Sequence, residues 1–272
     1  MLGKLMKHEW HAVWKIPTLF IGVLLIVSLL TGSCFAFPMW ESDWIGLPLS
    51  IVSLFMLYYM AIIVCSVGIT VYLAVRFYKS MFTDEGYLTH TLPATSHQIL
   101  LSKVFTMSIW NLLSILGVAV SIFLLVGSVT VFWADNFSQI SMEFRRLFHE
   151  VAESGMLNEV VRTMFTGVFM VIVSSFTGTM TVVGSICIGQ MLRKHRILGA
   201  IGAYFGIMTV TQIVGTMVMF PMMFQMTFYS SFEEMFSSYL TMYWILTVIC
   251  FGIGVGLYFL SEYLIRRQLD LE

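Results

Sequence analysis

The sequence predicts an all-α polytopic membrane protein, with six transmembrane helices, an N-terminal amphipathic helix at the membrane interface and a short helix in a cytoplasmic loop. Of the 272 residues, 58% are hydrophobic and only 11% are charged, and the mean hydropathy is +0.89. Soluble domains average about 25% charged residues. Six runs lack Asp, Glu, Lys and Arg, and each exceeds the roughly 20 residues that cross a bilayer. A soluble enzyme is therefore excluded.

The six charge-free runs define the expected spans. Because membrane strands would give short alternating segments, helices are expected instead. We expect a single transmembrane domain over 1–272. Its spans are predicted at 16–38, 47–75, 104–133, 163–192, 197–220 and 239–264. Pro221 divides the fifth run, 197–232, so 221–239 is expected at the outer interface or as a broken helix that dips into the membrane.

Residues 1–15 carry an amphipathic pattern. Apolar side chains recur at near-helical spacing, and Lys4, Lys7, His8 and His11 oppose them. We expect a helix lying on the inner leaflet surface, with its tryptophans at the level of the headgroups. The alternative is a simple basic flank of the first span. That first span is longer than the hydrophobic region of a signal peptide and is expected to be retained.

The positive charges set the expected orientation. Eleven of the fourteen Lys and Arg residues precede the first span, follow the sixth, or lie between spans two and three or four and five. The other three lie in an outer loop, 135–162. Both termini are therefore expected in the cytoplasm. The four cysteines form no CxxC pattern, so neither a disulfide framework nor a metal site is expected.

The cytoplasmic loop 76–103 is the most informative segment. Thr83 or Asp84 is suited to cap a short helix, Pro93 ends it, and Thr95 or Ser96 is suited to cap the next helix. We expect a short amphipathic helix between two spans, suited to pass a movement from a soluble partner into the membrane. An ordinary capped loop is the alternative.

Several function classes are disfavoured. The six charge-free runs leave Asp, Glu, Lys and Arg only at the ends of the predicted spans, whereas carriers driven by protons or sodium place ionisable groups at membrane depth. The chain has no GxxxxGK[ST] motif, so any ATP hydrolysis is expected in another polypeptide. It has no HExxH or GxSxG motif, and we expect no catalytic residue and no enzyme activity. The net charge of −1 gives no sign of a nucleic-acid partner.

The run Glu-Gly-Tyr-Leu-Thr-His-Thr-Leu-Pro at 85–93, followed by Gln-Ile-Leu-Leu-Ser-Lys at 98–103, resembles the loop after span two in type-2 ABC transporter permeases. In that family the loop forms a coupling helix gripped by the ATPase subunit. The resemblance implies the membrane-spanning subunit of an ABC exporter in a cell membrane, with a bacterial inner membrane expected. The outer loop 135–162 departs from the family pattern and suggests a particular subfamily or outer partner.

The resemblance also implies site residues and partners. The implied coupling helix comprises Asp84, Glu85, Gly86, Tyr87, Leu88, His90, Thr91, Leu92 and Pro93. The implied interfacial connecting helix acts through Lys7, Trp10 and Trp14. Gly202 and Gly206 suit a subunit interface, although packing within one bundle is the simpler explanation. The implied partners are an ABC ATPase that binds ATP and Mg, a second permease (identical or related) and the lipid bilayer. No cofactor bound by this chain itself is expected.

The expected function is therefore ATP-driven export of a hydrophobic or amphipathic substrate, such as a peptide, an antimicrobial or a lipid-like molecule. The methionine-rich stretch 217–226 is the expected exit for such a substrate. Two alternatives of other classes stay open. One is a membrane sensor or scaffold that transports nothing, and the other is a facilitator that works without ATP.

Overall fold

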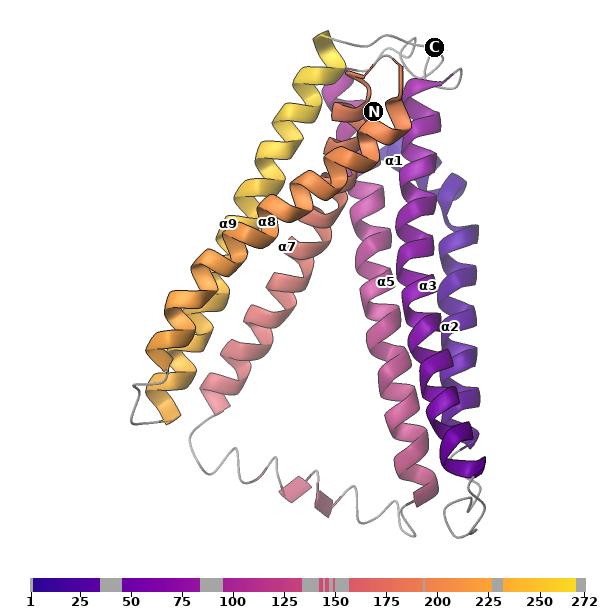
Figure 1. Cartoon of the computed structure of the whole chain (residues 1–272), viewed down its shortest axis with the longest axis vertical. Coiled ribbons are helices and arrows are strands. Elements are labelled where there is room, and N and C mark those ends of the chain that lie inside the picture. The colour runs from indigo at the N-terminus through magenta and orange to yellow at the C-terminus, as the bar shows by residue number, and fades with distance from the viewer. Residues whose placement is uncertain are drawn as a thin grey trace. The chain divides into compact units, whose positions relative to one another are not determined.

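The computed structural model in Figure 1 describes residues 2–34, 46–83, 95–133, 157–192, 194–226 and 232–267, together with five residues between 142 and 149. Every long element it describes is a helix. These are α1 (Leu2–Val13), α2 (Lys15–Cys34), α3 (Gly46–Phe82), α5 (Ser96–Trp133), α7 (Leu157–Gly189), α8 (Arg196–Met226) and α9 (Phe232–Arg267). All except α1 are long and apolar enough to cross a membrane. The predicted all-α, six-span fold is confirmed, and the chain is a multi-pass membrane protein.

Several helices extend beyond the predicted spans. Helix α3 continues past residue 75 to Phe82, and α5 begins at Ser96 rather than at 104. The predicted ends were set by charged residues, which mark the edge of the hydrocarbon but do not interrupt helical hydrogen bonding. As a consequence His97, which the sequence suggested to be in a loop, lies in the first turn of α5.

Helix α8 also differs from the expectation at its end. The sequence suggested a break at Pro221, but the helix continues through this proline to Met226. A proline inside a helix removes one backbone hydrogen bond, and membrane helices tolerate this loss where nearby groups compensate. The expected broken segment 221–239 is therefore helical at both of its described parts, up to Met226 and from Phe232 onward.

The chain forms two compact units. The second unit contains residues 13–72 and 113–161, and its described core is the packing of α2 with parts of α3 and α5. The Tyr58 hydroxyl of α3 lies 2.9 Å from the Ser121 hydroxyl of α5. A side chain at Gly32 of α2 would overlap Ser128 of α5. Small residues thus allow these helices to approach closely, as is common in membranes.

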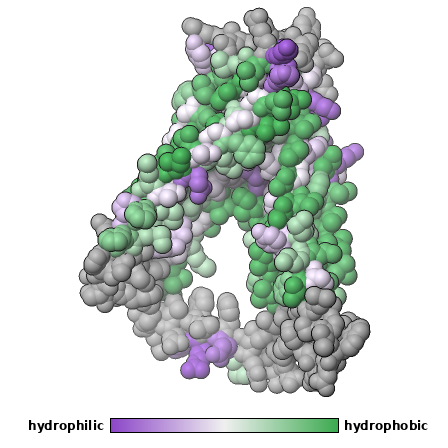
Figure 2. All heavy atoms as spheres, in the orientation of Figure 1, coloured by the Kyte–Doolittle hydropathy of each residue, from purple (hydrophilic) through white to green (hydrophobic). Residues whose placement is uncertain are grey.

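The first unit contains residues 1–12, 73–112 and 162–272. Its most buried helix is α7, which contacts α5 and α9 through hydroxyl-bearing and aromatic side chains. Helices α8 and α9 run side by side in this unit (Figure 1). The surface of α8 is largely hydrophobic, as the visible face in Figure 2 shows.

Candidate functional site

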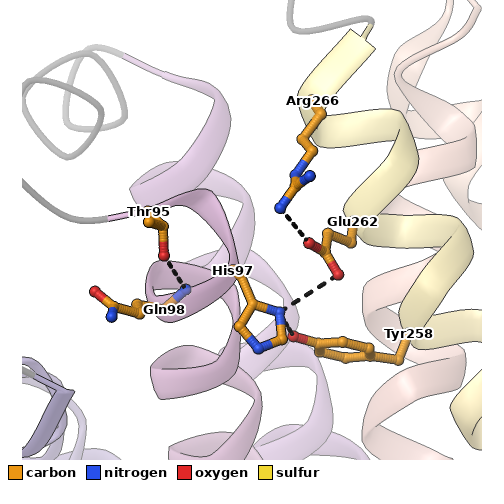
Figure 3. Close-up of polar contacts among 6 residues, drawn as sticks. All are labelled: Thr95, His97, Gln98, Tyr258, Glu262 and Arg266. Atoms are coloured by element: carbon orange, nitrogen blue, oxygen red, sulfur yellow. Dashed lines mark hydrogen bonds and ion pairs between the residues drawn. The ribbon is translucent and has the colours of Figure 1, made fainter.

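The first turn of α5 is held by a side-chain cap. The Thr95 hydroxyl accepts a hydrogen bond from the backbone N–H of Gln98 at 3.3 Å (Figure 3). The backbone carbonyl of Thr95 accepts another from the N–H of Ile99 at 3.1 Å. Threonine at this position satisfies N–H groups that have no partner within the helix. Of the two capping residues suggested by the sequence, the structure therefore uses Thr95.

A polar cluster joins this turn of α5 to the last turns of α9 (Figure 3). His97 Nδ1 lies 2.9 Å from the Tyr258 hydroxyl and 3.4 Å from Glu262 Oε2. The other Glu262 oxygen, Oε1, pairs with the Arg266 guanidinium at 2.8 Å. The His97 side chain is 47% exposed, so its ion pair with Glu262 is well screened by solvent. The cluster fastens the start of α5 to the end of α9.

Helix α1 is attached to the same part of α5 by two side-chain contacts. Lys103 Nζ donates to Glu9 Oε1 at 2.5 Å, and Lys103 is only 4% exposed. The Trp10 ring, next to Glu9 in α1, stacks on Trp110 of α5, with ring centroids 4.8 Å apart. A buried ion pair and an aromatic stack together fix the position of α1 on α5.

Deeper in the first unit, polar groups connect α7 to both of its neighbours. The Ser175 hydroxyl of α7 donates to the Ser108 carbonyl of α5 at 2.6 Å. The Asn111 amide of α5 donates to the Ser175 carbonyl at 3.3 Å. On the other side of α7, the Thr177 hydroxyl donates to the Cys250 carbonyl of α9 at 3.0 Å. These bonds satisfy polar groups inside an apolar bundle, where an unpaired group is costly.

The residues implied by the resemblance have mixed outcomes. The coupling-helix residues Asp84, Glu85, Gly86, Tyr87, Leu88, His90, Thr91, Leu92 and Pro93 lie outside the described residues. In the N-terminal helix, Lys7 is exposed and Trp14 is 44% exposed, but Trp10 packs on protein rather than standing free for the headgroups. Trp10 and Glu9 both contact α5, which explains this difference.

Gly202 and Gly206, the suggested subunit interface, both lie on the exposed surface of α8. A β-carbon at either position would meet no atom within 4 Å. These glycines therefore make no close packing contact within the described part of the chain. The simpler explanation, that they pack inside one bundle, does not apply to the residues the structure describes.

Sequence reasoning missed Glu9, Lys103 and the cluster around His97. Their partners are distant in sequence, since Glu9 and Lys103 are 94 positions apart and His97 and Glu262 are 165 positions apart. One signal was present, because Glu9 is the only acidic residue of α1 and interrupts an otherwise basic segment. Among the described residues, no group of three or more His, Cys, Asp or Glu is placed to hold a metal ion.

No family model, curated protein or solved structure matches the chain.

Proposed function

We propose that the chain is the permease subunit of an ATP-driven ABC exporter, which moves a hydrophobic or amphipathic substrate out of the cell. In this proposal a separate ATPase subunit binds segment 84–93, and a second permease subunit completes the transporter. The chain resides in the cell membrane with both termini in the cytoplasm. The resemblance of 85–93 and 98–103 to the coupling loop of type-2 permeases motivates the proposal.

The observation that supports it best is the attachment of α5, the helix that follows this segment. Within its first fifteen residues α5 contacts α9 through His97 and α1 through Lys103 and Trp110. Ile99 and Leu100 between these contacts are almost fully buried. A displacement of the start of α5 would therefore be passed to two other helices, as coupling to a soluble ATPase requires.

The end of α3, on the other side of the segment, is equally well anchored. Phe77, Met81 and Phe82 are each at most 4% exposed. The Thr83 hydroxyl donates back to the Lys79 carbonyl at 2.6 Å. Segment 84–94 thus lies between two helix ends that carry buried side chains, so force applied to that segment would act on packed parts of α3 and α5.

The test is affinity purification of the tagged full chain in mild detergent, with mass spectrometry of the proteins that co-elute. We expect a Walker-motif ATPase with the wild type and its loss with Leu88→Asp/Leu92→Asp. The matched control is Met191→Asp/His195→Asp, which adds two acids at exposed positions of another helix connection and should retain the ATPase.

Three outcomes contradict the proposal. If the intact wild type co-elutes with no ATPase, a sensor, scaffold or facilitator is favoured. If both double variants lose the ATPase equally, the interaction does not depend on segment 84–93. If a co-purified ATPase is neither stimulated nor inhibited by the wild-type chain in liposomes, the two proteins are not coupled.

A further inference from the structure

Helix α1 exposes one purely basic face. Lys4, Lys7, His8 and His11 follow the spacing i, i+3, i+4, i+7, which places them on one side of a helix, and all four are exposed. The His11 ring donates only to the Lys7 carbonyl of its own helix, at 2.8 Å. No described residue forms an ion pair with either lysine.

The only acid of α1 does not neutralise this face. Glu9 points to the opposite side of the helix and pairs with the buried Lys103 of α5. Trp10 is also turned towards α5, where it stacks on Trp110. Glu9 and Trp10 are thus used in packing on protein. The exposed side chains of α1 that remain are the basic ones, Lys4, Lys7, His8 and His11.

Two independent observations place α1 at the edge of the bilayer. First, Trp14 alone separates α1 from α2, whose 20 residues are long and apolar enough to span the membrane. Because α1 has 12 residues, it is about 18 Å long, and its whole basic face lies within that distance of the start of a span.

Second, α1 contacts α5 at the boundary between the polar start of α5 and its charge-free part. Lys103 is the last charged residue of α5, and the sequence from 104 to 134 contains no Asp, Glu, Lys or Arg. The Glu9–Lys103 pair therefore marks the transition from the polar end of α5 to its apolar part. Both observations put α1 at the depth of lipid headgroups.

From this geometry we infer that the basic face of α1 (Lys4, Lys7, His8 and His11) binds the headgroups of acidic phospholipids. The contact is electrostatic, because the four exposed side chains are basic and Trp10, which could insert among acyl chains, is stacked on Trp110 of α5. The phosphate of an acidic lipid supplies the negative charge that this face lacks. This inference does not depend on the transport function proposed above.

The test uses the full chain reconstituted in liposomes of equal phosphatidylglycerol and phosphatidylcholine. After extraction and washing in mild detergent, the two lipids retained per protein are quantified by mass spectrometry. A lysine near an anionic surface contributes roughly fivefold in binding, so Lys4→Gln/Lys7→Gln should lower phosphatidylglycerol retention about tenfold or more. Raising salt to screen surface charge should have the same effect on the wild type.

The matched control is Lys79→Gln/Lys194→Gln, which removes two exposed lysines from other helix ends and should retain most of the phosphatidylglycerol. All variants keep Glu9 and Lys103, so the attachment of α1 is preserved, which circular dichroism and gel filtration can verify. Equal retention of both lipids by the wild type would overturn the inference, as would equal losses in the two variants. Unchanged lipid retention together with loss of a co-purified protein in Lys4→Gln/Lys7→Gln would assign the face to a protein partner instead.

Discussion

Helices α7 and α8 follow one another along the chain and are both long and apolar, yet their surroundings are opposite. In the apolar stretch of α7, 67% of the residues are buried, whereas in that of α8 none is. Ser175 and Thr177 of α7 bond to the backbones of α5 and α9. Thr209 and Thr216 of α8 bond only to carbonyls of their own helix. Two helices of similar apolar composition are thus buried in one case and exposed in the other.

The difference shows which helix of the first unit is covered by its neighbours and which is exposed. Helix α7 fills the space between α5 and α9, and its hydroxyl groups are used between helices. Helix α8 presents Gly202, Gly206 and large apolar side chains such as Phe205 and Met217 outward. In a membrane such a surface meets lipid or another protein, and the small residues would permit a close helix contact. The predictions below test this contrast between a packed helix and an exposed one.

The largest effect is expected at Gly189, the last residue of α7. A β-carbon there would lie 2.5 Å from the backbone nitrogen of Ala200, the fifth residue of α8. Because the obstacle is backbone, it cannot rotate away, and Gly189→Ala should destabilise the protein by about 3 kcal/mol. Thermal unfolding of the full chain in detergent would measure this loss.

The control for Gly189→Ala is Gly206→Ala, where a β-carbon meets no atom within 4 Å. Alanine is the better helix former by about 1 kcal/mol, so this variant should be as stable as the wild type or slightly more stable. If the two alanine variants unfold at the same temperature, the close approach of α7 to α8 at Gly189 is contradicted.

A smaller effect is expected at Ser175, which is 2% exposed. Ser175→Ala removes the hydrogen bond to the Ser108 carbonyl and leaves that carbonyl without this donor. The expected loss is about 1 kcal/mol, because interhelical hydrogen bonds in membranes contribute modestly. The control is Ser174→Ala, whose hydroxyl is exposed and bonds within its own helix to Val171. An equal loss in both variants would contradict the assignment of α7 as the packed helix.

Much of the fold could be predicted from sequence because it depends on local properties. Charge-free runs predict the spans, since charges are costly in hydrocarbon. The pattern of Lys4, Lys7 and His11 predicts α1, and Thr95 is a cap by residue type. Each of these signals is complete within a few turns of helix, so no knowledge of the neighbouring helices is needed.

The contrast between α7 and α8 could not be predicted in the same way. Both helices contain a long charge-free stretch, and which of them is buried depends on partners distant in the chain. The pairing of Glu9 with Lys103 could not be predicted either, because nothing in the sequence around one residue indicates that the other is its partner. The proposed coupling residues 84–93 rest on resemblance alone, because they lie outside the described residues.

The smallest effect is expected at His97, which joins the two neighbours of α7 at their ends. Its Nδ1 lies 3.4 Å from Glu262 Oε2 and 2.9 Å from the Tyr258 hydroxyl. A tyrosine hydroxyl can donate or accept a hydrogen bond, so the Tyr258 contact does not require a charged ring.

Because His97 is 47% exposed and Glu262 already pairs with Arg266, the ion pair should contribute only about 0.5 kcal/mol. His97→Gln keeps a polar side chain but cannot form the ion pair, so it should unfold at a slightly lower temperature than the wild type. The measurement is thermal unfolding of both full chains in the same detergent. If the two proteins unfold at the same temperature, the attachment of α5 to α9 depends on apolar packing, and His97 adds nothing to it.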